Sequence, residues 1–209
     1  WVARGFLHAS QRSRSIKVGP DQFPEAWDRI LHYAERFGLK TVPDVYVVQE
    51  GGVLNAFAAK HHRRNFIQIN SDIFEVGTTE IGPRPKDPKA LDFVIAHEMG
   101  HVAASHVTYW YSWLSGFVWY VPFLGTALSR SKEYTADNWA HSVVPDGVQG
   151  IVMLSSGKYL YPTVNGEAIA ERAGEPDGFV WLLNAFATHP IQTKRLAALY
   201  DRSSPGKLF

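Results

Sequence analysis

Apolar side chains recur at helical spacing early in the chain, over residues 25–38. The repeating positions are Trp27, Ile30, Leu31, Ala34 and Phe37. A period of three to four residues predicts an amphipathic helix. Asp21 precedes this segment as a cap-like start, and Gly38 supplies a stop. The pattern therefore predicts a helix ahead of the first strand.

Three short runs rich in Val, Ile, Phe and Tyr come next, over residues 44–50, 51–60 and 64–70. Runs of this length and composition are typical of β-strands. We expect them to form a small antiparallel sheet. The basic run 60–64 is interpreted as a solvated hairpin tip, the alternative being a second metal or anion site.

A segment rich in Pro and Gly, residues 81–90, separates the expected sheet from the rest of the chain. From Pro88 the pattern becomes helical again and stays mostly helical to about Tyr200. The amphipathic helices of the C-terminal half are expected to pack against the segments before them. The pattern as a whole predicts an α+β fold, mainly helical, with a small antiparallel β-sheet.

Composition narrows the possible functions. The chain has 209 residues, of which 45% are apolar, enough to bury one core. Its 21 Lys and Arg nearly balance its 20 Asp and Glu, so the charge gives no reason to expect a nucleic-acid partner. Because there is no cysteine, disulfides and thiolate metal sites are excluded, and any metal must be bound through His, Asp or Glu.

The first 20 residues differ from the rest, since they carry four basic side chains and no acidic one before position 21. We therefore expect a basic N-terminal segment, 1–20, followed by one catalytic domain, 21–209. The chain begins with Trp1 and lacks an apolar signal segment at its start. These features suggest a soluble catalytic piece of a longer protein whose upstream part holds a membrane anchor.

The segment ALDFVIAHEMGHVAASH places His97 and His101 four residues apart. On a helix this spacing stacks two side chains on one face, so both imidazoles can reach one ion. Glu98 lies about 100° further round the helix, close enough to act on a metal-bound water without becoming a ligand. The alternative is an ordinary histidine pair, but the flanking residues are apolar, and burying these groups without a shared partner would be costly.

A catalytic zinc ion usually has three protein ligands and one position open to water, so a third ligand is needed. The segment RSKEYTADNWAHS offers Glu133, with Asp137 one helical turn later. We interpret Glu133 as the third ligand of a single catalytic Zn²⁺. Asp137 is then placed to accept the free N–H of a ligating histidine. The alternative is a solvated helix face that carries two carboxylates.

Four segments, LNAFA, HEMGH, SRSKEYTADNWA and THPIQTKRL, follow one another along the chain. Together they resemble the M48 family of membrane-linked gluzincin metallopeptidases, which includes the CAAX-prenyl protease and the bacterial heat-shock protease HtpX. The resemblance covers about residues 24–199. It implies a zincin-like metallopeptidase domain that binds zinc through His97, His101 and Glu133 and uses Glu98 for catalysis.

The same resemblance implies roles for residues outside the paired histidines. Asn55, Ala56 and Phe57 are expected to form an edge strand whose backbone pairs with an extended substrate. His189 is expected to act in catalysis by stabilising the tetrahedral intermediate, and Arg195 is expected to support the site. The alternative for His189 is a polar residue that closes the start of a helix.

The resulting functional prediction is a zinc-dependent endopeptidase in which Glu98 activates a zinc-bound water to hydrolyse peptide bonds. Its partners would be polypeptide substrates, in particular membrane-associated or misfolded proteins. The alternatives are an inactive zinc-binding or membrane-associated module and a zinc hydrolase of a small amide or ester. The intact Glu98 disfavours the inactive module, because a purely structural zinc site has no use for a base.

Residues 107–129 carry no charge and are long enough to meet the length rule for a membrane-spanning helix. A single crossing would separate Glu133 from His101, so we expect a hairpin-like insertion that returns to its starting side. Its Trp and Tyr residues are typical of a membrane–water boundary. Two interpretations remain open, a membrane-contacting surface and an apolar hairpin packed inside the domain. The expected localisation is membrane-associated, on the cytoplasmic side.

Overall fold

A computed structural model describes residues 2–52, 54–61, 63–108, 116, 121, 123–175, 177–204 and 206–208. The described elements are α1 (Val2–Arg14), β1 (Ile16–Lys17), α2 (Pro24–Arg36), β2 (Asp44–Val48), β3 (Ala56–His61), β4 (Arg64–Asn70), α3 (Ser71–Thr78), α4 (Pro88–Ala103), α6 (Leu124–Val143), α7 (Gln149–Leu160), α8 (Gly166–Glu171), α9 (Gly178–Phe186) and α10 (Gln192–Tyr200). Short 3₁₀ turns lie at Pro145–Gly147, Tyr161–Thr163 and Arg172–Gly174. This succession confirms the predicted α+β, mainly helical fold class.

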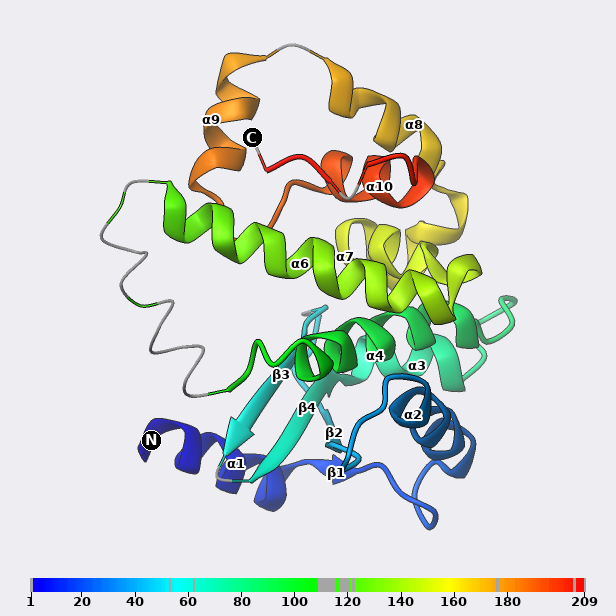
Figure 1. Ribbon diagram of the computed structural model, residues 1–209. Coiled ribbons are helices and arrows are strands. Elements are labelled where there is room, and N and C mark those ends of the chain that lie inside the picture. The colour runs from blue at the N-terminus through cyan, green and yellow to red at the C-terminus, as the bar shows by residue number, and fades with distance from the viewer. Residues whose placement is uncertain are drawn as a thin grey trace.

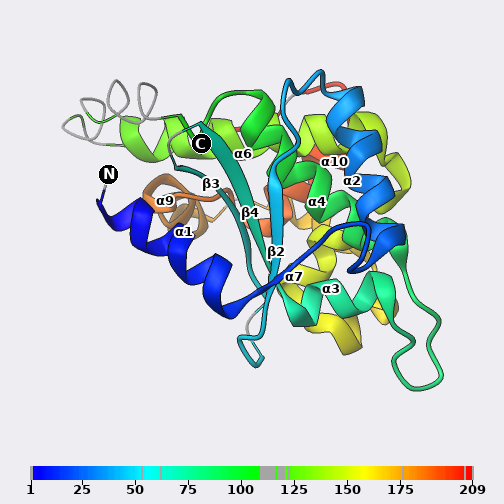
Figure 2. The same ribbon diagram turned by 90° about the horizontal axis from the view of Figure 1, so that it is seen from below.

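Helix α6 crosses the middle of the molecule, with the sheet and α1 to α4 on one side and α8, α9 and α10 on the other (Figure 1). Seen from below, α1 lies on one face of the sheet, while α2, α3 and α4 lie toward the other face (Figure 2). Helix α4 packs against both the sheet and α6, and most of its side chains are buried. The core therefore surrounds the helix that carries the paired histidines.

Helix α2 confirms the first prediction from the apolar pattern. Ile30, Ala34 and Phe37 are buried as expected, whereas Leu31 remains exposed. Gly38 ends the helix with φ 62°, a left-handed conformation that glycine adopts without steric cost. The expected cap at Asp21 is wrong, because the helix begins at Pro24, whose fixed φ suits the first helical position.

The sheet is mixed, so the prediction of a purely antiparallel sheet is wrong for one strand pair. Its order is β1-β2-β4-β3. Strands β3 and β4 form the expected antiparallel hairpin, whose last pair is His61 with Arg64, but β2 and β4 run parallel. Strand β4 is buried over Phe66 to Asn70, and it lies between β2 and β3 in the sheet. The chain therefore passes from β2 to the far edge before it returns as β4, which leaves β3 as an edge strand.

The basic N-terminal segment contributes α1 and β1. Strand β1 pairs with β2 through Ile16 and Lys17. Helix α1 is fixed to the sheet by a buried hydrogen bond of 2.5 Å from the Gln11 amide to the side-chain oxygen of Gln68 on β4. The N-terminal segment is thus joined to the sheet that β2, β3 and β4 form.

Most of the uncharged stretch 107–129 lies outside the described residues, which omit 109–115, 117–120 and 122. The expected hairpin-like insertion and its contact with a membrane therefore stay predictions. From Leu124 onward the stretch belongs to α6. None of the helices in the described ranges combines the length and apolar character that crossing a bilayer requires.

Candidate metal centre

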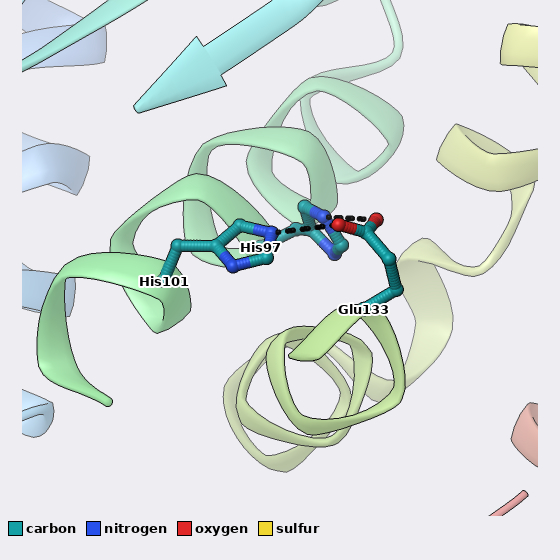
Figure 3. Close-up of side chains that lie close together, drawn as sticks. All are labelled: His97, His101 and Glu133. Carbon is teal, nitrogen blue, oxygen red and sulfur yellow. Dashed lines mark ion pairs between the residues drawn. The ribbon is translucent and has the colours of Figure 1, made fainter. Parts of the chain in front are cut away.

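The two histidines of HEMGH lie on α4 and face a carboxylate from α6 (Figure 3). The Nε2 atom of His97 is 3.5 Å from Glu133 Oε2, and that of His101 is 3.3 Å from Glu133 Oε1. All three ligand atoms lie within 4.8 Å of one another. His97 and Glu133 are buried, and His101 is half-buried. Glu133 thus converges with two histidines that lie 32 and 36 positions earlier in the sequence.

The spacing of these atoms fits a zinc ion. Bonds of zinc to His nitrogen and carboxylate oxygen are about 2.0–2.2 Å, so two ligands of a tetrahedral site lie about 3.3–3.6 Å apart. Each histidine nitrogen lies within this range of one oxygen of Glu133, His97 of Oε2 at 3.5 Å and His101 of Oε1 at 3.3 Å. In the described part of the chain, no other group of His, Asp and Glu brings three ligand atoms as close together. The expected ligand set is therefore geometrically able to bind the ion.

The close approach of α4 and α6 explains why the ligands meet. Helix α4 starts at Pro88, where the Asp87 carboxylate accepts a hydrogen bond of 3.1 Å from the Ala90 N–H. Gly100 faces α6, and a Cβ atom at this position would lie 2.9 Å from Trp139 Cβ and 3.2 Å from the backbone of Ala136. Only glycine permits this approach without displacement. This role of Gly100 depends on the second helix, so it is not apparent from the motif that contains the residue.

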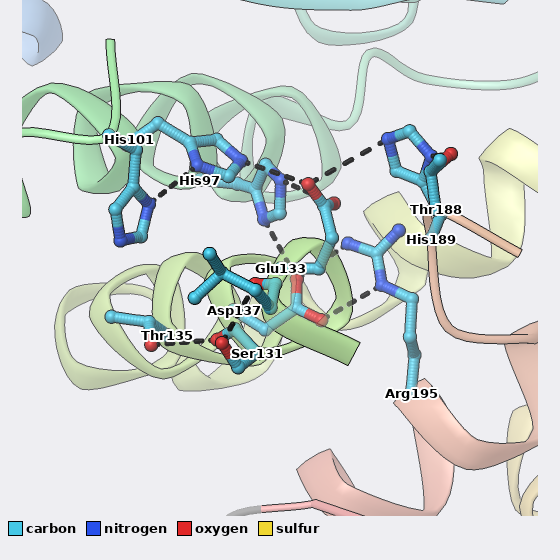
Figure 4. A network of polar contacts seen from close by, with 11 residues as sticks. His97, His101, Ser131, Glu133, Thr135, Asp137, Thr188, His189 and Arg195 are labelled. Atoms are coloured by element: carbon cyan, nitrogen blue, oxygen red, sulfur yellow. Dashed lines mark hydrogen bonds and ion pairs between the residues drawn. The ribbon is translucent and has the colours of Figure 1, made fainter. Parts of the chain in front are cut away.

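His97 lies against Asp137, one turn beyond Glu133 on α6 (Figure 4). The His97 Nδ1 atom is 2.8 Å from Asp137 Oδ1. Burial alone would raise the pKa of Asp137, but Arg195 and His97 outweigh it and lower this pKa to about 2. The carboxylate is therefore ionised and can only accept, so the hydrogen of His97 lies on Nδ1. Its Nε2 faces Glu133 and is the nitrogen that a metal ion would bind in place of a hydrogen.

Arg195 reaches this pair from α10 and makes two hydrogen bonds to Asp137. Its Nε donates to Oδ2 at 2.9 Å, and its Nη2 donates to Oδ1 at 2.6 Å. Both side chains are almost completely buried. Such a two-point contact fixes the plane of the carboxylate as well as its charge. Arg195 thus contacts the same carboxylate that contacts His97.

The pKa values of Glu98 and Glu133 are shifted in opposite directions by burial and nearby charges. Burial is the largest influence on Glu98, and it raises the pKa of this carboxyl. Burial also acts to raise the pKa of Glu133, but His101 and His97 outweigh it, so this pKa is strongly lowered. The two neighbouring carboxyls thus differ: Glu133 stays ionised beside the imidazoles, whereas Glu98 is suited to hold a proton.

A cavity of about 120 Å³ opens beside the ligands. Its lining residues are Leu54, Asn55, Ala56, Val94, His97, Glu98, Glu133, Ile151, Leu154, His189 and Arg195. Two of the three residues expected to bind substrate, Asn55 and Ala56, therefore border the cavity. Phe57 belongs to the same edge strand, where it pairs with Gln68, and does not line the cavity.

His189 lies on the segment between α9 and α10, at the rim of the site. Its Nε2 is 3.7 Å from Glu133 Oε1, and its side chain is 68% exposed. Thr188 lies next to its other ring nitrogen, with its hydroxyl 3.2 Å from Nδ1. The structure thus brings His189 to the open side of the cavity.

The ring of His106, to which the sequence pattern gives no role, touches the second ligand histidine. His106 Nδ1 lies 3.0 Å from His101 Nδ1. Burial, followed by the charges of His101 and Lys132, lowers the pKa of His106 to about 4, so its ring is neutral near pH 7. The signal available in sequence was its position directly after the end of the helix that carries the ligands.

Two histidines and a glutamate on packed helices, with a second glutamate following the first histidine, define a metallopeptidase type of site. The family model described as Peptidase family M48 matches residues 20–118 and 109–203 of this chain. The chain therefore belongs to peptidase family M48, whose members are zinc metallopeptidases. No curated protein and no solved structure was found to match it.

Proposed function

We propose that this chain is a zinc-dependent endopeptidase. His97, His101 and Glu133 are the ligands, and Glu98 is the general base. The observation that carries the proposal is the pair of histidine-to-glutamate distances, 3.5 and 3.3 Å, beside a cavity that His97, Glu133 and Glu98 line. Membership of family M48 supports the same reaction.

The chemistry is divided between the ion and the residues of the chain. When bound, zinc supplies a Lewis acid that polarises the scissile carbonyl and acidifies the attacking water. Glu98 takes a proton from this water and passes it to the nitrogen of the leaving amine as the C–N bond breaks. The raised pKa of its buried carboxyl favours this temporary protonation. The peptide gains one water molecule, and no covalent bond forms between enzyme and substrate.

The surrounding side chains hold the reacting groups. Asp137 keeps His97 in the form that presents Nε2 to the metal, and Arg195 keeps Asp137 ionised and in place. His189 faces the open side of the cavity, close to Glu133. In this proposal its Nε2–H donates to the oxygen that becomes negatively charged in the tetrahedral intermediate.

The edge strand supports a polypeptide substrate. Strand β3 has only one neighbour in the described sheet, β4, so its other edge can hydrogen-bond to an extended chain. Asn55 and Ala56 lie where this edge reaches the cavity. In the proposal Phe57 continues the same edge. Because only an unfolded or flexible segment can add as a strand, misfolded proteins are suitable substrates.

An exposed apolar surface supports a membrane-associated function. Helix α9 has no charged residue, and Phe179 is 84% exposed, Leu183 64% and Phe186 62%. Phe123, at the start of α6, packs against Phe186 with ring centroids 5.0 Å apart. Aromatic and aliphatic side chains of this kind insert into a membrane surface. Co-sedimentation of the protein with lipid vesicles is the expected result, and a protein that stays in the supernatant would refute this part.

The substitution Glu98→Gln tests the reaction. It leaves all three ligands in place, so zinc binding should stay near the wild-type level. Hydrolysis of an unfolded protein such as casein should fall by about 10²–10⁴-fold, because the proton acceptor is lost. The matched control is Glu80→Gln, which alters an exposed glutamate outside the site. Cleavage by Glu98→Gln at the wild-type rate would contradict the role of this residue.

Glu98→Gln also tests the proposed pairing of β3 with substrate, because this variant should bind a peptide without cleaving it. A peptide inhibitor whose backbone nitrogens are methylated cannot donate to β3 and should bind more weakly than the unmethylated peptide. Equal affinities would show that the edge strand does not pair with substrate.

A further inference from the structure

The two proposed ligand histidines have different partners at Nδ1, the ring nitrogen that faces away from the metal site. His97 contacts a carboxylate through Nδ1, whereas His101 contacts another imidazole. The Nδ1 atoms of His101 and His106 are 3.0 Å apart, and the two rings are tilted by 59°. A distance of 3.0 Å between two nitrogens is that of a hydrogen bond.

The end of α4 explains this contact. Ser105 has φ 61°, and its N–H donates to the Val102 carbonyl at 3.0 Å. The next N–H, that of His106, donates to the His101 carbonyl at 2.9 Å. These two bonds form a Schellman motif, which brings the residue after the left-handed position against the residue five places earlier. The backbone that ends the helix thus places the His106 ring next to the second ligand.

The position of the hydrogens follows from the geometry. His101 faces Glu133 with Nε2, which lies 3.3 Å from Oε1, so a metal ion would take the Nε2 lone pair. The hydrogen of His101 must then lie on Nδ1. Only one hydrogen fits between the two Nδ1 atoms, so His106 accepts it with its own Nδ1 lone pair. The remaining hydrogen of His106 consequently lies on Nε2.

We propose that His106 is a positioning residue for the metal site: it accepts the Nδ1–H of His101 and thereby holds this ligand in its metal-binding tautomer and orientation. The inference rests on the proposed ligand set. It gives each histidine ligand its own acceptor, Asp137 for His97 and His106 for His101. Outer partners of this kind affect metal binding strongly, because they fix the ring and raise its basicity.

Zinc affinity is the direct test, measured by competition with a chromophoric chelator. His106→Leu removes the acceptor and should weaken zinc binding by about 10–100-fold. His106→Asn places an amide oxygen as many bonds from the backbone as Nδ1, so its affinity should return close to the wild-type value. His32→Leu is the matched control, because His32 is exposed and lies outside the site.

The outcomes separate this inference from the proposed function. If the wild-type protein fails to bind zinc, the proposed metal site is wrong and the inference falls with it. If the wild-type protein binds zinc and His106→Leu binds it equally well, only the inference is overturned. Nitrogen NMR of histidine-labelled, zinc-loaded wild-type protein needs no variant. It should show hydrogen on Nδ1 of His101 and on Nε2 of His106, and a hydrogen on Nδ1 of His106 would overturn the proposal.

Discussion

Two residues with nearly the same left-handed backbone end two helices in the same way. Gly38 follows α2 with φ 62°, and Ser105 follows α4 with φ 61°. In α2 the motif is completed by hydrogen bonds of 2.9 Å from Gly38 N–H to Glu35 and from Leu39 N–H to Ala34. Glycine adopts this conformation freely, whereas a residue with a Cβ atom is strained there.

Exchanging the two residue types should therefore have opposite effects on stability. Ser105→Gly is expected to raise the free energy of unfolding by about 0.5–1 kcal/mol, and Gly38→Ser to lower it by about 1 kcal/mol. A Cβ atom at Gly38 would meet nothing within 4 Å, so the effect there isolates the backbone. Chemical denaturation at a fixed zinc concentration measures both changes. A loss of stability in Ser105→Gly would refute the assigned strain.

Among single residues, the sequence predicted those whose role depends only on their own chemistry and on their spacing within one helix. His97 and His101 share a helix face because they are four residues apart, and Glu133 and Asp137 repeat this relation on α6. Gly100 was missed because its importance depends on a second helix that sequence cannot place. His106 was missed because its contact arises from the helix end, and the left-handed residue there is a serine instead of the usual glycine.

Helices α3 and α7 are joined by one cation, Lys158. Its Nζ atom contacts the Asp72 carboxylate and lies 2.6 Å from Glu75 Oε2. Lys158 and Asp72 are each 15% exposed at the side chain, so the pair is largely shielded from water. The hydrogen bond from Lys158 outweighs the effect of burial and lowers the pKa of Asp72. The ionised form of Asp72 therefore stabilises the folded state.

Lys158→Met should lower the free energy of unfolding by about 1–3 kcal/mol at pH 7. Because the pKa of Asp72 is lower in the folded state, its contribution is present above its unfolded pKa near 3.9 and is lost as the pH falls further. The difference between wild type and Lys158→Met should therefore shrink below about pH 4. Lys40→Met, at an exposed site, is the control. A difference that grows on acidification would contradict this assignment.

Elements defined by local pattern were predictable, but the pairing of distant strands was not. The period of apolar residues predicted α2, and the change of pattern at Pro88 marks the first residue of α4. Strands β3 and β4 form the expected hairpin. The parallel pair of β2 with β4 could not be derived, because strand order depends on which strand is buried on both sides, a property of the assembled sheet.

In the whole molecule, the proposed zinc ion would join α4, which packs on the sheet, to α6. Figure 1 shows α4 beneath α6, with the sheet below and the C-terminal helices above. Zinc that binds the folded state alone stabilises it by about 4 kcal/mol at a concentration 1,000 times its Kd. For a chain of this size each kcal/mol raises the unfolding temperature by about 2–4 °C.

Chelation should therefore lower the unfolding temperature by about 8–16 °C, and added zinc should restore it. Differential scanning calorimetry measures the change. His101→Ala is the comparison, because a protein with only two ligands should lose most of the dependence on zinc. An unfolding temperature that does not respond to chelator in the zinc-loaded wild type would contradict the proposed link between α4 and α6.

The site is completed late along the chain. Arg195 lies 58 residues beyond Asp137, the carboxylate that it fixes. During translation the histidines and both α6 carboxylates leave the ribosome well before Arg195. A nascent chain at that stage has its ligands but an Asp137 without its guanidinium partner. We therefore expect hydrolytic competence to appear only after α10 has been synthesised.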